Sequence, residues 1–116
     1  MTISKKNCIF VILMSLIELN LAKIIELCKR YRVKNLSVFG SILTERFNEQ
    51  SDVDLLVNFE SHDPNSLEFD YVSNYFKLKD SLEELFNRKV DLIEDGEQLN
   101  PLFRKKVYQN KQLIYG

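Results

Sequence analysis

The chain has 116 residues, of which 45% are hydrophobic, with three glycines and two prolines; this suits one domain with its own core. Sixteen basic residues against 17 acidic ones give a formal net charge of −1, which provides no overall attraction for a polyanion. We therefore expect neither nucleic acid nor a membrane as a direct partner. Two cysteines, Cys8 and Cys28, are too few for a disulfide framework or a four-cysteine zinc site, which fits a reducing, cytoplasmic location.

The N-terminus carries an apolar run, Ile9–Ile17, behind a Lys-Lys pair. The run is far shorter than the roughly 20 residues that span a bilayer, and no small-residue cleavage site follows it, as a signal peptide would require. We expect residues 1–13 to be an N-terminal extension, disordered or helical, and residues 14–116 to form a single domain. The sequence leaves open whether synthesis starts at Met1 or at Met14.

The first predicted element is an amphipathic helix from about Ser15 to Tyr31, because its apolar residues recur at helical spacing. A short strand, 35–39, follows and ends at Gly40, and a short helix over 41–47 comes next. A second strand runs from Asp52 to about Phe59. Its alternating apolar residues predict one face that packs, which leaves Asp52 and Asp54 on the opposite face.

The second half of the sequence predicts a helix from Asn65 to about Asn87, a strand over 89–93, a helix over 100–108 and a last strand over 112–115. Asn100-Pro101 is typical of an N-cap followed by proline at the first helical position. The whole predicts an α+β domain with a small mixed β-sheet flanked by helices.

Helical spacing also predicts which side chains of the later helices face inward. We assign Tyr71 and Tyr75 to packing rather than to stacking on a nucleotide, and the basic group Arg104-Lys105-Lys106 to a solvated helix face. The remaining residues expected to point inward are Val72, Phe76, Leu78, Leu82, Leu85 and Phe86 in one helix and Leu102, Phe103 and Val107 in the other.

A glycine turn followed by two alternating carboxylates stands out in this order of elements. Gly40 allows a ligand to approach the main chain closely, and Ser41, at the predicted start of a helix, offers a hydroxyl and free N–H groups to an anion such as a triphosphate. Asp52 and Asp54 lie two apart in a strand, so both project from one face. Carboxylates with substrate phosphates are the usual ligands of Mg²⁺, so the pattern indicates a magnesium nucleotide site.

Asp91 is the natural third carboxylate. It lies in a predicted strand between Val90 and Leu92, whose side chains point to the other face. If this strand pairs beside Asp52 and Asp54, three carboxylates meet, and a metal would offset their repulsion. The carboxylate nearest the attacking hydroxyl would then act as general base.

These residues resemble the minimal nucleotidyltransferase (MNT) family of the DNA polymerase β superfamily, whose signature is Gly-Ser, ten residues, then Asp-x-Asp. Here the signature is Gly40-Ser41 followed by Asp52-Val53-Asp54, and the resemblance extends from about Leu16 to Tyr115. It implies a polymerase β-like nucleotidyltransferase fold. It also implies that Asp52, Asp54 and Asp91 are the catalytic metal ligands for two Mg²⁺ ions.

The resemblance further implies that Gly40 and Ser41 contact the nucleotide phosphates. Many members of the family follow Gly-Ser with a basic, glycine-containing stretch, whereas this chain has 42–47, in which only Arg46 offers a cation. Arg46 is therefore the third expected nucleotide-binding residue.

The domain is similar to MntA-like antitoxins of HEPN/MNT toxin–antitoxin systems, which implies transfer of AMP from ATP to a tyrosine of a HEPN-domain ribonuclease toxin. The expected assembly is a hetero-oligomer with the toxin or a homodimer. Two alternatives stay open: an antitoxin that neutralises its toxin by binding, with little or no activity, and a nucleotidyltransferase that modifies a small molecule.

Overall fold

The computed structural model describes residues 16–40, 52–61 and 71–116. Within them the elements run in the order α2 (Leu21–Arg30), β1 (Val33–Phe39), β2 (Val53–Phe59), α3 (Tyr71–Phe86), β3 (Val90–Glu94), α4 (Pro101–Asn110) and β4 (Gln112–Tyr115). The predicted α+β architecture is confirmed. The N-terminal extension over 1–13 and the short helix over 41–47 lie outside the described residues.

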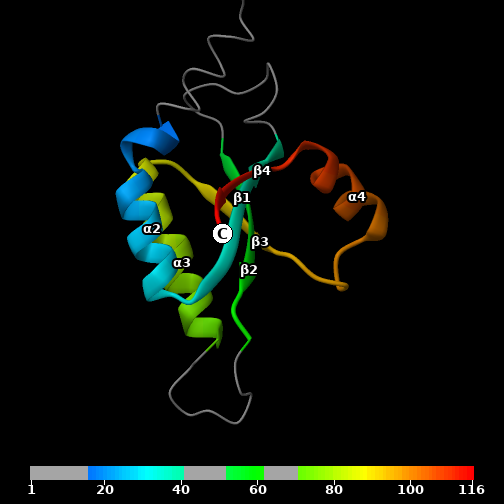
Figure 1. The fold of residues 1–116 in the computed structure, drawn as a ribbon, viewed down its shortest axis with the longest axis horizontal. Helices are drawn as coiled ribbons and strands as arrows, with labels where there is room; N and C mark the ends of the chain where they lie inside the picture. Colours follow the sequence, from blue (N-terminus) through cyan, green and yellow to red (C-terminus); the bar gives the residue numbers. More distant parts are fainter. Residues whose placement is uncertain (1–15, 41–51, 62–70) are drawn as a thin grey trace, which may run out of the picture.

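The four strands form one mixed sheet in the order β3-β2-β1-β4. β1 pairs antiparallel with both β2 and β4, whereas β2 and β3 run parallel. Figure 1 shows α2 and α3 together on one side of this sheet and α4 on the other side. The parallel β2–β3 pair is joined through α3, as parallel strands require a crossover connection.

The main core lies between the sheet and the α2–α3 layer. Its fully buried members include Ile24 from α2, Leu78 and Leu82 from α3, and Leu55 and Val57 from β2. The alternation in β2 therefore predicts this packed face correctly. Asn74 Nδ2 donates to Tyr31 O at 2.6 Å, which ties the first half of α3 to the end of α2.

A second, smaller core lies on the opposite face of the sheet, beneath α4. It consists of Phe39, Leu56 and Val107, with Leu99 and Ile93 packed against it. The prediction that only one face of β2 packs is therefore incomplete, because Leu56 is buried on the second face. α4 is held over the same face that carries the predicted carboxylates.

The predicted helix over 15–31 is interrupted at Asn20. Residues 16–19 are helical, but the Asn20 side chain donates to Leu16 O at 2.7 Å and its N–H donates to Ile17 O at 3.2 Å. Asparagine side chains compete in this way with the regular helical pattern. The long amphipathic helix is therefore α2, Leu21–Arg30.

The start of α4 and the end of α3 agree with the sequence. Asn100 Oδ1 accepts from the N–H groups of Leu102 (2.9 Å) and Phe103 (3.3 Å), with Pro101 at the first helical position, so the predicted N-cap is confirmed. Asn87 follows α3 with φ +51°, the left-handed conformation that commonly ends a helix.

The outer edge of β3 is covered by side chains. Lys89 O and Asp95 N bond to β2, so the residues between them at even positions direct their main-chain groups away from β2. Glu83 Oε2 accepts from Val90 N at 3.3 Å, Tyr75 OH donates to Leu92 O, and Gln98 Nε2 donates to Glu94 O at 3.1 Å. Each outward-facing residue of β3 therefore has one side-chain partner.

Candidate active site

Asp54 and Asp91 lie side by side on neighbouring strands. They are Cα partners in the parallel β2–β3 pair, so their side chains emerge on the same face of the sheet. Asp54 is half-buried and Asp91 is exposed. The predicted pairing of the Asp91 strand beside Asp54 is confirmed, and it brings two of the three predicted carboxylates together.

Asp52 lies directly before β2 and is exposed. The start of this strand is fixed by the bond from Val53 N to Lys89 O at 3.0 Å. In extended backbone, residues two apart share a face, which places Asp52 on the side of Asp54. All three carboxylates thus belong to one end of the β2–β3 pair.

Gly40 directly follows β1 and lies against Asp54. Its φ is +79°, and a Cβ at this position would lie 2.2 Å from Asp54 Oδ2. Both facts require glycine, because a side chain would be strained and would also collide with the carboxylate. Since Phe39 is the Cα partner of Asp54, Gly40 holds the end of β1 close beside the Asp54 carboxylate.

The donor set suits a hard cation such as Mg²⁺, which takes oxygen ligands. In the described residues, no three His, Cys, Asp or Glu side chains are gathered closely enough to hold an ion. A metal at this site would therefore be held first by Asp54 and Asp91, with Asp52 turning in from the exposed start of the strand. Ser41 and Arg46, the other predicted nucleotide contacts, lie outside the described residues.

α4 forms the wall beside this site. Val107 is buried against Phe39, and the Phe103 ring meets the Phe39 ring edge-to-face with centroids 6.1 Å apart. The prediction that Leu102 points inward is wrong, since this side chain is 80% exposed, whereas Phe103 packs one side of its ring on Phe39 and is 38% exposed. The second core beneath α4 is small, and Val107 is the buried residue of this helix.

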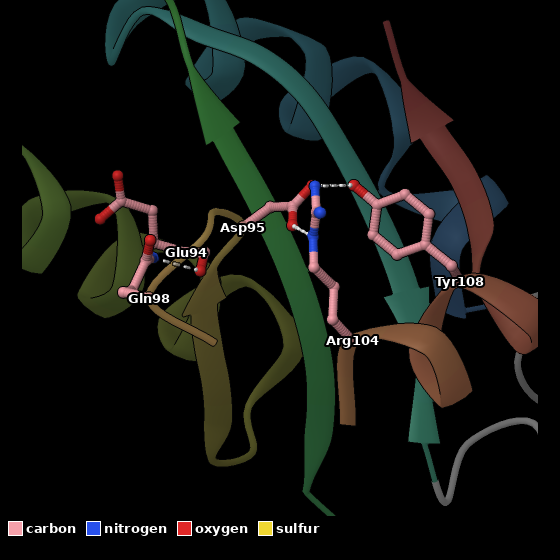
Figure 2. Close-up of polar contacts among 5 residues, drawn as sticks. All are labelled: Glu94, Asp95, Gln98, Arg104 and Tyr108. Carbon is pink, nitrogen blue, oxygen red and sulfur yellow. Dashed lines mark hydrogen bonds and ion pairs between the residues drawn. The ribbon is translucent and has the colours of Figure 1, made fainter. Parts of the chain in front are cut away.

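A polar cluster that sequence reasoning missed fixes α4 to the end of β3 (Figure 2). Arg104 Nε donates to Asp95 Oδ1 at 3.0 Å, and the Tyr108 hydroxyl donates to Asp95 Oδ2. The Arg104 guanidinium and the Lys111 ammonium lie over the Tyr108 ring, 4.9 and 3.9 Å from its centroid. Arg104 is thus engaged by Asp95, which corrects the assignment of this residue to a solvated face.

The electrostatics of Asp95 follow from these contacts. Its side chain is 8% exposed, and burial alone would raise the pKa of the carboxyl, but the hydrogen bonds from Tyr108 and Arg104 outweigh burial and hold the pKa below its ordinary value. The same hydrogen bond to Asp95, more than burial, raises the pKa of the Tyr108 phenol. No short motif marks this cluster, because its partners are 9 and 13 residues apart.

The tyrosines of α3 have packing roles, as predicted. Tyr71 packs edge-to-face on Phe59 with centroids 5.5 Å apart, and Tyr75 bonds to the β3 main chain. Burial raises the pKa of both phenols, strongly for Tyr71. Neither side chain belongs to the acidic face.

Comparison with known proteins identifies the fold and the enzyme class. The family model described as "Polymerase beta, Nucleotidyltransferase" matches residues 22–116. The chain belongs to this family. It is therefore a nucleotidyltransferase with the polymerase β-like fold that the MNT resemblance implies.

Its relatives include archaeal proteins. One from Methanocaldococcus jannaschii, named "Putative protein adenylyltransferase", is 37% identical over 87 residues, which cover 75% of this nucleotidyltransferase and 80% of the relative. "Protein adenylyltransferase MntA" of Thermococcus cleftensis is 37% identical over 68 residues, which cover 59% and 62% of the two chains.

Solved structures share the fold. A structure described as a "putative minimal nucleotidyltransferase" superposes with a TM-score of 0.66 at 27% identity, covering 85% of this chain and 93% of the other. A toxin–antitoxin crystal structure with AMP-PNP gives a TM-score of 0.61 at 20% identity, covering 84% and 73%. A tri-AMPylated HEPN toxin of Shewanella oneidensis in complex with MNT antitoxin gives 0.56 at 20% identity, covering 85% and 71%. In the described part of the chain, no helix combines the length and apolarity needed to cross a bilayer.

Proposed function

We propose that this nucleotidyltransferase is a Mg²⁺-dependent protein adenylyltransferase and an antitoxin, which transfers AMP from ATP to a tyrosine of a HEPN-domain toxin. The observation that carries the proposal is the pairing of Asp54 with Asp91 beside Gly40. The names of the archaeal relatives support AMP as the transferred group. The toxin as partner is supported by the MNT signature and by the complexes that share the fold.

In this mechanism Asp52, Asp54 and Asp91 would hold two Mg²⁺ ions. Bound magnesium would neutralise phosphate charge and clamp the attacking and leaving oxygens of an in-line displacement. The main chain at Gly40, with Ser41 and Arg46, would hold the phosphates, since the missing Cβ keeps this side of Asp54 open.

The chain's own part in the chemistry is to hold and move a proton. Asp91, the more exposed member of the pair, would accept the proton of the tyrosine hydroxyl as its oxygen attacks the α-phosphorus of ATP. The bond from that phosphorus to the bridging oxygen breaks, and pyrophosphate leaves. The product is a tyrosyl-AMP phosphodiester.

The test is to incubate the HEPN toxin with this protein, ATP and Mg²⁺ and to measure the intact mass of the toxin. We expect an increase by one or more AMP units. Asp54→Asn and Asp91→Asn should each reduce the rate by about 10²-fold or more, the range for a lost acid–base group. Asp80→Asn is the matched control, because Asp80 is an exposed carboxylate on α3, in the layer on the other side of the sheet.

Three outcomes would refute the proposal or favour an alternative. If the wild-type protein adds no AMP to the toxin, the proposed transfer is refuted. If Asp52→Ala combined with Asp54→Ala still neutralises the toxin, the protein acts as an antitoxin by binding. AMP transfer to a small hydroxyl compound, with an unmodified toxin, would assign it to small-molecule chemistry.

A further inference from the structure

The first turn of α4 carries apolar side chains that the fold leaves in solvent. Leu102 is 80% exposed and Phe103 is 38% exposed, although the sequence places both at positions expected to face inward. Large apolar side chains that stand out beside a functional site mark an interaction surface more often than isolated ones do. Whether these two side chains mark such a surface depends on where they lie relative to the carboxylates.

Phe103 is linked to the carboxylates through the side chain of Phe39. Its ring meets the Phe39 ring edge-to-face, Phe39 is the Cα partner of Asp54, and the next residue, Gly40, lies against the Asp54 carboxylate. The first turn of α4 therefore lies on the same face of the sheet as the carboxylates, at the rim of the predicted site.

The rim is also basic. Lys105 and Lys106 are exposed, and at three and four residues from Leu102 they lie on its side of the helix. Arg104 is held by Asp95, so these two lysines are the cations that α4 presents beside Leu102. For a chain with a net charge of −1, this is a local excess of positive charge. We call Leu102, Phe103, Lys105 and Lys106 the α4 rim.

We propose that the α4 rim is the docking surface for the acceptor protein, which contacts Leu102 with an apolar side chain and Lys105 and Lys106 with flanking acidic residues. This inference rests on the proposed function and adds the chemistry by which the acceptor is recognised. A protein is favoured over the nucleotide base, because a residue 80% exposed protrudes and does not line a pocket. Clustered apolar anchors surrounded by charge are typical of protein interfaces.

The experiment compares Leu102→Gln with Val72→Gln. Both residues are apolar and exposed, Leu102 at 80% and Val72 at 61%, but Val72 lies on α3 in the layer on the other side of the sheet. Binding of the HEPN toxin is measured by calorimetry without ATP, and AMP transfer is measured as kcat and KM for the toxin. The dissociation constant for an ATP analogue with Mg²⁺ is measured in parallel.

We expect Leu102→Gln to weaken toxin binding and to raise KM by about tenfold, the loss of one interface anchor, with kcat and analogue affinity unchanged. Lys106→Glu should do the same and should respond to ionic strength, whereas Val72→Gln should behave as wild type. The inference is overturned if both α4 variants bind the toxin within twofold of wild type, or if Leu102→Gln weakens the nucleotide analogue instead.

The two proposals fail in different ways. A wild-type protein that binds the toxin through the α4 rim but transfers no AMP would refute the proposed function and leave the docking surface in place. A protein that modifies the toxin with the same KM after both Leu102→Gln and Lys106→Glu would refute the docking surface alone.

Discussion

Asp54 and Asp91 are direct neighbours across the parallel β2–β3 pair. Like charges at adjacent positions on one face of a sheet repel each other. A cation that binds both would convert this repulsion into attraction. Binding of a metal ion at this pair is therefore expected to stabilise the fold.

We predict that Mg²⁺ stabilises the folded protein, because a ligand that binds only the native state raises the free energy of unfolding, by about 2.7 kcal/mol at 100 times its dissociation constant. Thermal unfolding with MgCl₂, against NaCl at equal ionic strength, measures the effect. Asp91→Asn should remove most of the increase in Tm. An equal Tm in both salts, with and without an ATP analogue, would contradict the prediction.

Gly40→Ala should destabilise the protein and disturb Asp54, because the new Cβ would lie 2.2 Å from Asp54 Oδ2 and the backbone has φ +79°. A strained backbone of this kind costs about 1–3 kcal/mol. The matched control is Gly96→Ala, whose Cβ would meet only the end of the Gln98 side chain, which can turn away. Urea unfolding of both variants checks the difference, and equal losses would speak against a special role for Gly40.

Acid should loosen α4 through Asp95. Because hydrogen bonds lower the pKa of this carboxyl in the folded state, its contribution to stability is present above the ordinary value of 3.8 and is lost as the pH falls through the lower folded-state pKa. Tyr108→Phe removes one donor and brings the folded-state pKa closer to 3.8, so we expect a smaller acid-induced loss that is complete at higher pH, with a cost at neutral pH of about 1 kcal/mol.

Urea unfolding of wild type and variant between about pH 2 and pH 7 measures this difference. Tyr115→Phe is the control, since Tyr115 packs against the main core on the other face of the sheet. If the free energy of unfolding falls with acid in the same way in wild type and Tyr108→Phe, the phenol does not contribute to the lowered pKa of Asp95.

Cys28 should be inert in the native state. It is fully buried, and burial raises the pKa of its thiol to about 12, so the reactive thiolate is nearly absent at neutral pH. In a Cys8→Ser background we expect alkylation to occur only through unfolding, and its rate should rise with urea. Rapid alkylation without denaturant would show that the α2 layer opens more easily than its packing indicates.

The sequence predicted those parts of the structure that depend on local pattern. The period-2 alternation in β2 placed Val53, Leu55 and Val57 on the packed face, and the Asn100-Pro101 pair marked the start of α4. Asp91 could be proposed as a partner of Asp54 because both stand on strands with apolar neighbours on either side. Each of these inferences needs only the spacing of residues within one element.

What the sequence could not predict depends on which surfaces the fold covers. Helical spacing groups Val72 and Phe76 with the core residues of α3, yet they are 61% and 53% exposed. Leu102 and Phe103 likewise stand at inward positions by helical spacing but are exposed, above the small second core. The bonds from Asp95 to Arg104 and Tyr108 join separate elements, so no local pattern encodes them.

The covered edge of β3 limits where a further strand can pair with the sheet. A strand that added there would have to displace Glu83, Tyr75 and Gln98 from the main chain, whereas unprotected edges are where foreign strands attach. In the described part of the chain the sheet has one other edge, β4. Within the described residues, we therefore expect a strand from a partner protein or from an aggregating copy to join at β4, which directly follows the helix that walls the carboxylates.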